Sequence, residues 1–216
     1  MIKVSSVSKS YGNLQVLKNI NLEVANEEIV CLVGASGAGK STLLHIMGTL
    51  DKPDKGKVII DEQDVFAMSD KALSKYRNQH IGFVFQFHHL LPEFTAIENI
   101  YLPAIIGGKS KSEAEKEAKE LLEIFNLSNR ATHKPSELSG GEQQRIAIAR
   151  ALINKPSVIF ADEPSGNLDS QNATELNELF VYLRKVFHQT FVIVTHNESL
   201  VKVADRVLQI KDGAIV

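Results

Sequence analysis

The chain has 216 residues, of which 44% are hydrophobic and 23% charged, a composition that suits one sizeable globular core. Its 24 basic and 26 acidic side chains give a formal net charge of -2, so we expect no nucleic-acid partner. The single cysteine, Cys31, excludes an internal disulfide, and the sequence has neither a signal-peptide core nor an apolar run of about 18 residues, so a soluble, cytoplasmic chain is expected.

The first third is expected to consist mainly of strands and turns. Residues 1–7 alternate as in a strand, and residues 29–33 form an apolar run that stops at Gly34. Such a run is typical of a strand buried on both faces of a parallel sheet. Residues 57–60 follow a turn signal, and residues 81–85 end at Gln86, which indicates two further strands.

The middle of the chain changes to a helical pattern at Thr95. Thr95 and Glu98 are spaced as a capping box, which predicts a helix start. Residues 112–125 predict a second helix with an apolar face, and the charge run 116–120 is its solvated side. Residues 87–150 are therefore expected to be a helical insertion.

The last third alternates strands with a helix. Residues 158–161 and 191–194 are apolar runs, and a helical stretch, 172–187, lies between them. This alternation predicts an α/β core with a parallel sheet. We expect a single domain over residues 1–216, with a core from residues 1–86 and 151–216 and the helical insertion between them.

Residues 34–41 match the phosphate-binding loop pattern GxxxxGK[ST] in full. The motif follows a predicted strand and precedes a helical run, 42–47, and its glycines let backbone N–H groups surround phosphates. Lys40 is expected to reach the β- and γ-phosphates and Ser41 to ligate Mg²⁺. This context argues against a plain glycine-rich turn, although the motif alone does not separate ATPases, GTPases and small-molecule kinases. The candidate ATP contacts here are Gly34, Ala35, Ser36, Gly37, Ala38, Gly39, Lys40, Ser41 and Thr42.

Two carboxylates, Asp162 and Glu163, follow the predicted strand 158–161. An acid at the end of such a strand lies at the carboxyl edge of the sheet, where α/β proteins bind ligands. Asp162 is expected to hold Mg²⁺, and Glu163 to orient or deprotonate the attacking water. Alone, the pair fits a structural turn before Pro164 equally well, but beside a complete phosphate loop the catalytic interpretation is favoured.

Residues 138–142 read LSGGE and are the most specific segment of the chain. Ser139 and Glu142 have capping-box spacing, and a helix is expected over residues 143–152. Two glycines at a helix start expose N–H groups and make a second anion site. Two phosphate-binding elements so far apart in sequence raise the question of whether both contact one nucleotide.

With these motifs in this order, the sequence resembles the ABC ATPase family over essentially its whole length. The resemblance implies a P-loop, RecA-like parallel-sheet core with an N-terminal antiparallel β subdomain and an inserted helical subdomain. It also implies ATP and Mg²⁺ as ligands, and a head-to-tail dimer of two copies that buries two ATP molecules. The residues then expected to contact the ATP held by the other copy are Leu138, Ser139, Gly140, Gly141 and Glu142.

Four further positions match the family pattern. Tyr11 resembles the aromatic that stacks on adenine, although ordinary packing beside a turn is the alternative. Gln86 resembles the glutamine that contacts Mg²⁺ and senses the transport partner. Asp169 lies in residues 165–169, which resemble the segment that faces its counterpart across the dimer. His196 resembles the switch histidine at the γ-phosphate rather than a polar strand cap, which makes it a third catalytic candidate beside Lys40 and Glu163.

The apolar stretch 86–95 indicates which branch of the family is closest. In the family this region receives a coupling helix from integral membrane subunits, although part of it must also serve the subdomain core. With residues 133–137 it resembles the lipoprotein-releasing branch, whereas residues 162–169 resemble a wider group that includes efflux and cell-division ATPases. Ser165 and Asn197 depart from the usual Thr and Asp.

The resemblance therefore implies an ATP-hydrolysing transporter subunit, peripheral on the cytoplasmic face of the bacterial inner membrane. Lipoprotein release is the leading expectation, with efflux or cell division as alternatives. An ABC ATPase acting on DNA or ribosomes is less favoured, because residues 87–137 leave no room for a long coiled coil and the chain has one ATPase domain.

Overall fold

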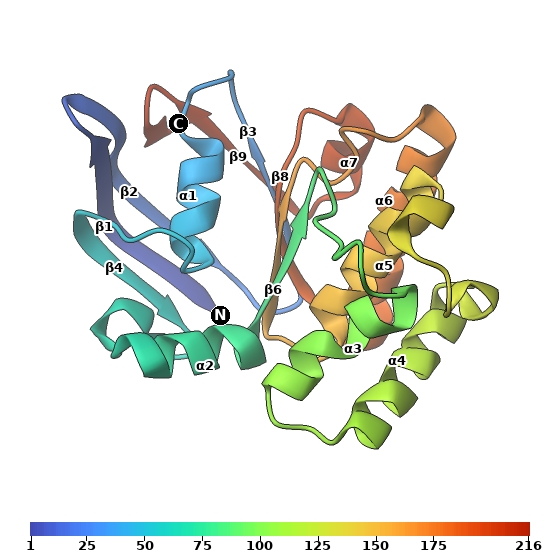
Figure 1. The fold of residues 1–216 in the computed structure, drawn as a ribbon. Coiled ribbons are helices and arrows are strands. Elements are labelled where there is room, and N and C mark those ends of the chain that lie inside the picture. The colour runs from blue at the N-terminus through green and yellow to red at the C-terminus, as the bar shows by residue number, and fades with distance from the viewer.

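The computed structural model describes residues 1–216 and contains two sheets (Figure 1). The first is antiparallel, with strand order β2-β1-β4-β5. Its strands are β1 (Ile2–Tyr11), β2 (Leu14–Val24), β4 (Lys55–Ile60) and β5 (Gln63–Asp64).

The second sheet has the order β10-β9-β3-β8-β7-β6. Its central pairings are parallel, and only the edge strand β10 runs antiparallel to its neighbour. The strands are β3 (Ile29–Val33), β6 (Ile81–Phe85), β7 (Val158–Asp162), β8 (Thr190–Val194), β9 (Arg206–Lys211) and β10 (Ala214–Ile215).

Helices lie on both sides of the parallel sheet. Figure 1 shows α1 (Lys40–Met47) between the two sheets and the larger helices gathered beyond the parallel sheet. The other helices are α2 (Asp70–His80), α3 (Ala96–Ile106), α4 (Lys111–Ile124), α5 (Gly140–Leu152), α6 (Ser170–Phe187) and α7 (Glu198–Val203). Short 3₁₀ turns are η1 (Val65–Ala67), η2 (Ser128–Arg130) and η3 (Pro135–Glu137).

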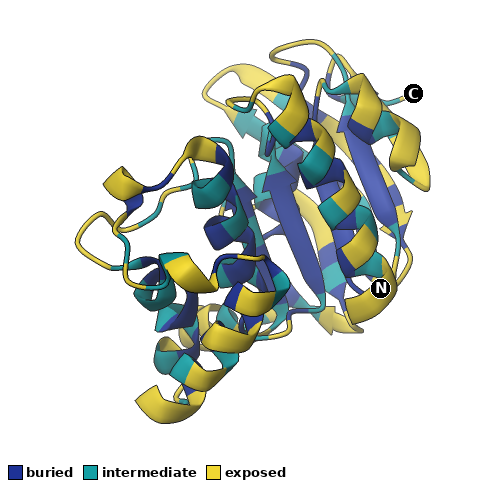
Figure 2. Ribbon diagram, turned by 90° about the vertical axis from the view of Figure 1, so that its right-hand side faces the viewer, coloured by how far each residue is buried: buried dark blue, intermediate teal, exposed yellow.

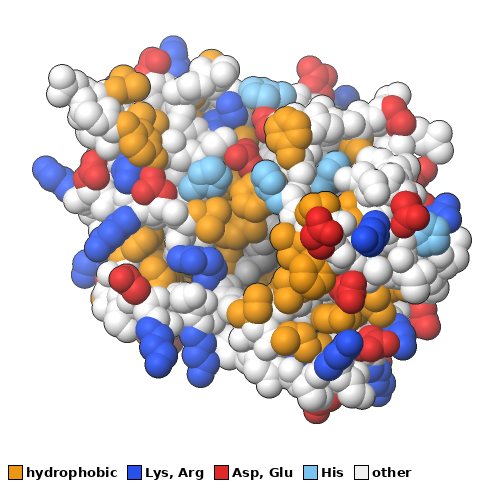
Figure 3. All heavy atoms as spheres, in the orientation of Figure 1, with side chains coloured by type: hydrophobic (Ala, Val, Ile, Leu, Met, Phe, Trp, Pro, Cys, Tyr) orange, Lys and Arg blue, Asp and Glu red, His pale blue; other side chains and the backbone are white.

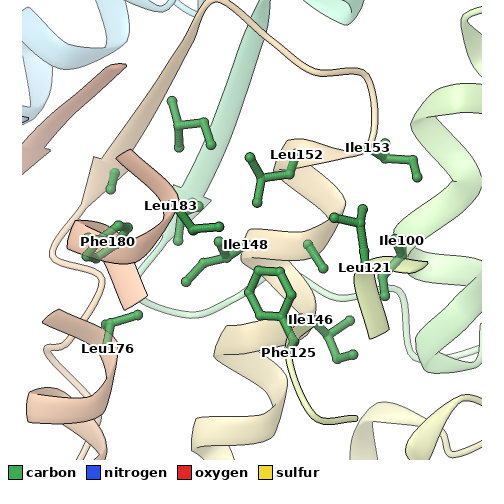
Figure 4. Packing of buried hydrophobic residues seen from close by; sticks show 14 of the residues in the cluster. Ile100, Leu121, Phe125, Ile146, Ile148, Leu152, Ile153, Leu176, Phe180 and Leu183 are labelled. Carbon is green, nitrogen blue, oxygen red and sulfur yellow. The ribbon is translucent and has the colours of Figure 1, made fainter. Parts of the chain in front are cut away.

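The strands β3, β7 and β8 are buried on both faces, and their alternate side chains enter two separate cores. In β3, Ile29 and Cys31 belong to the core shared with the helical side, whereas Val30 and Leu32 belong to the core around α1 and the antiparallel sheet. Figure 2 shows these strands as a buried layer, and Figure 4 shows side chains of α4, α5 and α6 meeting in the helical core. This two-sided burial explains the continuous apolar runs in the sequence.

The α/β fold class is confirmed: a parallel core, an N-terminal antiparallel sheet and helices from the middle of the chain. The helical run at residues 42–47 lies within α1, and the capping box at Thr95 and Glu98 is present, both as predicted. The expectation for the rest of the first third was wrong at α2, where a helix replaces strands and turns. Helix α2 has no fully buried residue, only Leu73 and Tyr76 of its hydrophobic side chains pack against the core, and Ser69 caps its start. None of the helices combines the length and the apolar character that spanning a bilayer requires.

Candidate functional site

The glycine-rich loop joins β3 to α1 at the carboxyl edge of the parallel sheet. Gly34 has a φ of 149°, and a Cβ there would lie 2.2 Å from the carbonyl oxygen of Ile210. Gly39 caps α1 with a φ of 103° in the left-handed region. Both positions therefore need glycine. The Nζ atom of Lys40 donates to the carbonyl oxygens of Gly34 and Ala35, at 2.9 and 3.0 Å, so the lysine lies folded over the loop.

A cleft of about 580 Å³ borders this loop. Ala35, Ser36 and Gly37 line one side, and the β9–β10 turn at residues 209–213 lines the other. The start of β2 completes the wall with Leu14, Gln15, Val16 and Lys18. Of the loop glycines, Gly37 therefore faces open space next to the antiparallel sheet.

Ser41 and Asp162 meet across the end of the sheet. The Oγ atom of Ser41 donates to Oδ1 of Asp162 at 3.1 Å. Asp162 is the last residue of β7, and Ser41 is in the first turn of α1. The hydroxyl and carboxylate oxygens are the kind of ligands that Mg²⁺ prefers, and here two of them lie side by side. His45 lies on the other side of the carboxylate, with Nε2 3.7 Å from Oδ2.

Glu163 and His196 follow neighbouring parallel strands and contact each other. The ladder pairs Asp162 with Val194, which brings the two strand ends together. Nε2 of His196 lies 3.3 Å from one carboxylate oxygen of Glu163, and its backbone N–H donates to the other at 3.2 Å. Glu163 itself has a φ of 47°, an uncommon conformation for a glutamate and one that is enriched at functional sites.

Gln86 lies at the end of β6 and is tied to the loop after Glu163. Its Nε2 donates to Oδ1 of Asn167 at 3.2 Å, and Nδ2 of Asn167 donates to its carbonyl oxygen at 3.1 Å. Beyond Gln86 the chain passes through two left-handed residues, His88 and His89. Arg150 of α5 donates to both of their carbonyl oxygens at 2.7 Å, and so fixes this turn.

The LSGGE segment forms the start of α5, with the predicted capping box present. The carboxylate of Glu142 accepts from the backbone N–H of Ser139 at 2.8 Å and from Nε of Arg130 at 2.7 Å. The hydrogen bond from Arg130 is the main cause that lowers the pKa of Glu142 below its usual value. The N–H groups of Gly140 and Gly141 have no backbone acceptor, so they are free to bind an anion.

Tyr11 ends β1 and is half exposed, with 51% of its surface accessible. Its hydroxyl donates to Asp51, which also accepts from Nζ of Lys9 at 2.8 Å. That same Nζ lies 5.0 Å from the centre of the tyrosine ring. The hydrogen bond to Asp51 is the main cause that raises the pKa of Tyr11. The ring is thus held in one orientation while much of its surface stays open.

The structure brings together most of the residues that the sequence singled out. The phosphate loop, Asp162, Glu163 and His196 share one edge of the sheet, and Gln86 adjoins them through Asn167. The LSGGE segment instead contacts η2, η3 and α6. The side chain of Asp169 caps α6 by accepting from the backbone N–H of Asn172 at 2.8 Å.

Sequence reasoning missed Arg130 and Arg150. Both arginines act at a distance along the chain, one on the carboxylate of Glu142 and the other on backbone carbonyls 61 and 62 residues away. No rule of sequence spacing predicts hydrogen bonds between residues so far apart along the chain. The one available signal was that Glu142 put a charge at a predicted anion site.

A parallel α/β sheet with a phosphate loop after one strand and an acidic pair after another defines a P-loop NTPase. The ABC transporter family model matches residues 17–166, and the chain therefore belongs to the ABC transporter family and is an ABC-type ATPase.

Individual proteins agree with this assignment. The lipoprotein-releasing system ATP-binding protein LolD of Cytophaga hutchinsonii is 58% identical, with 100% of this chain and 99% of that protein covered. The protein of the same name from Bacteroides fragilis is 59% identical, with 100% of both chains covered. Among solved structures, the ATP-binding cassette MJ0796, in a dimeric post-hydrolysis state bound to ADP and Pi, has a TM-score of 0.91 and 42% identity. That match covers 100% of this chain and 96% of the other.

Proposed function

We propose that this chain is the ATP-hydrolysing subunit of a transporter that releases lipoproteins from the bacterial inner membrane. The observation that carries the proposal is identity of 58–59% over the full length to proteins named for lipoprotein release. Fold alone does not choose among transported substrates, so the identity is what favours this branch.

Nucleotide binding is assigned to the loop and its neighbours. The N–H groups of residues 34–42 surround the phosphates, and Lys40 leaves its two carbonyl partners to reach the β- and γ-phosphates. Ser41 and Asp162 would hold Mg²⁺, with Gln86 as a third oxygen donor once its amide leaves Asn167. The ion would neutralise charge on the phosphates. Tyr11 would stack on the adenine with the face that Lys9 does not cover.

Hydrolysis is assigned to Glu163 and His196. Glu163 would accept a proton from the water that attacks the γ-phosphate, and His196 would donate to that phosphate. Their contact of 3.3 Å supports a role for the glutamate in orienting the imidazole before nucleotide arrives. Both groups follow parallel strands, so the pair is positioned by the sheet rather than by flexible loops.

The second half of each site would come from another copy of this chain. The free N–H groups of Gly140 and Gly141, with Leu138, Ser139 and Glu142 around them, would bind the γ-phosphate held by the partner's loop. Asp169 would lie near its counterpart across the dimer. Residues 87–150 would form the helical subdomain that presents this segment, and α5 continues beyond it to Leu152.

Glu163→Gln tests the dimer and the catalytic assignment together. The variant keeps the shape of the side chain but cannot take a proton, so it should bind ATP, form a stable dimer and turn over slowly. Light scattering with and without ATP measures the dimer, and phosphate release measures turnover. Near-normal turnover of this variant in its transporter complex would defeat the assignment of Glu163.

A membrane partner would dock beside Gln86. Phe87, Leu91, Phe94 and Ile106 are exposed hydrophobic residues in or near this segment, and Phe87 is 69% exposed. Figure 3 shows hydrophobic side chains gathered near the centre of this face, with histidines beside them. Contiguous apolar surface of this kind favours a protein partner. The chain would thus sit on the cytoplasmic face as a peripheral subunit.

Co-purification from bacterial membranes tests the transport proposal. Tagged chain should capture integral membrane subunits, and Phe87→Asp should abolish capture while thermal unfolding stays cooperative. Val186→Asp is the matched control, because Val186 is also exposed, at 52%, but lies on α6. Capture of efflux or cell-division subunits would contradict lipoprotein release, and recovery only with ribosomes or DNA would overturn the membrane partner itself.

A further inference from the structure

The first turn of α5 carries a negative charge at a position where the proposed dimer must receive another. Glu142 is the third residue of this helix, and its carboxylate bonds the N–H of Ser139, a residue assigned to the partner's γ-phosphate. The N–H groups of Gly140 and Gly141 attract anions. An uncompensated carboxylate beside them would repel the triphosphate.

Arg130 supplies the compensating charge. It belongs to η2, outside the LSGGE segment, and its Nε lies 2.7 Å from Oε1 of Glu142. No other basic side chain forms an ion pair with this carboxylate. The next cation along α5, Arg145, is already paired with Glu175 at 2.6 Å. The net charge of the first turn therefore depends on Arg130.

We propose that Arg130 is a positioning residue of the shared ATP site, which acts by neutralising Glu142 so that the start of α5 can bind the partner's triphosphate. This inference rests on the proposed ATP-dependent dimer. Arg130 would leave nucleotide binding by the phosphate loop of its own chain untouched, because it affects only the ATP held by the other copy.

A purely structural role makes a different prediction. If Arg130 serves only to tether η2 to α5 by its hydrogen bond, any variant without the arginine is defective, whatever stands at position 142. If it serves to cancel a charge, the arginine becomes dispensable once Glu142 is replaced by the uncharged Gln. Glutamine can still complete the capping box, so the helix start is retained.

The experiment measures the ATP concentration that gives half-maximal dimer, by light scattering, in the Glu163→Gln background. Arg130→Ala should raise this concentration by about three- to tenfold, as expected for loss of a partly exposed charge pair. Glu142→Gln should lower it. The double variant Arg130→Ala, Glu142→Gln should return close to the parental value, because the first turn is then neutral again. The defect of Arg130→Ala should also shrink as salt is raised.

The matched control is the ion pair of Lys119 with Glu115, at 2.8 Å on α4. Lys119→Ala should leave the ATP requirement unchanged. Binding of a fluorescent ATP analogue to the monomeric chain should be equal in the Arg130→Ala variant and its parent. A defect that persists in the double variant, or an Arg130→Ala chain that dimerises like its parent, overturns the inference. A parent that never dimerises with ATP refutes the proposed dimer instead.

Discussion

Gly141→Ala is expected to create a defined clash between the start of α5 and α6. A Cβ at this position would lie 2.4 Å from Oδ1 and 3.0 Å from Cγ of Asn172. Asn172 is not free to turn away, because its Nδ2 donates to Oδ2 of Asp169 at 2.8 Å. The alanine must therefore either break that hydrogen bond or push the two helices apart.

The size of the effect follows from two opposed terms. Replacing glycine by alanine inside a helix gains about 0.5–1 kcal/mol, whereas overpacking costs about 1–3 kcal/mol. Gly141→Ala should thus lower the free energy of unfolding by roughly 0–2.5 kcal/mol. Asn172→Ala alone should lose about 0.5–1.5 kcal/mol with its side-chain hydrogen bond to Asp169.

The double variant separates the clash from these terms. With the asparagine side chain gone, the alanine methyl group at position 141 has room and the helix gain remains, so the pair should be less destabilised than the sum of the single variants by about 1–3 kcal/mol. Urea unfolding of the nucleotide-free chain, followed by circular dichroism, measures this coupling. Additivity within about 0.5 kcal/mol would refute the reasoning.

Gly140 provides the control for this cycle. A Cβ there meets nothing closer than 3.9 Å, which is a carbon of Leu168. Gly140→Ala should therefore be neutral or stabilising, and it should show no coupling with Asn172→Ala. A coupling of equal size at Gly140 would mean that the effect comes from helix propensity rather than from packing.

Two further predictions concern the sheet. Gly34→Ala should abolish nucleotide binding measured by calorimetry, because its Cβ would meet the Ile210 carbonyl and its φ of 149° is strained for alanine; wild-type affinity would contradict this. Hydrogen bonding to Arg184 lowers the pKa of Asp205, so this carboxylate stabilises the fold above its unfolded pKa, and that stability is lost as pH falls through the folded value. Asp205→Asn should cost roughly 0.5–1 kcal/mol in urea unfolding at pH 7, and the difference should begin to shrink as pH falls below about 4 and disappear only below the lowered folded pKa; a difference that does not shrink with falling pH would contradict the pairing.

Much of the fold could be predicted because the buried faces of strands and helices determine which positions in the sequence are apolar. Strands such as β3 and β8 are covered on both faces, so nearly every residue is apolar and the run is easy to recognise. Helix α4 buries one face and shows a helical period. Helix α2 packs only two partly buried hydrophobic side chains, Leu73 and Tyr76, against the core, so its apolar pattern is short and was missed.

The site divides along similar lines. Lys40 and Ser41 could be predicted because backbone geometry dictates the residue types of the phosphate loop, and Asp162 because it ends a recognisable strand. The contact of Glu163 with His196 required the register of β7 and β8, which sequence does not specify. Arg130 and its carboxylate are joined only by the folding of the helical region.

The two halves of the proposed site are held in place in different ways, which affects how the ATP-dependent dimer could open and close. Backbone ladders fix Asp162 and the strand ends that flank the phosphate loop, so this half is held by the sheet. The start of the LSGGE helix meets α6, by the close approach of Gly141 to Asn172 and by the ion pair of Arg145 with Glu175, whereas its other end packs on β6, where Gly82 approaches Ala151. Helix α6 starts at Ser170, directly after the loop that follows Glu163. A change at the acidic loop can therefore reach the start of the LSGGE helix through α6, while the contact with β6 holds the far end of that helix against the sheet.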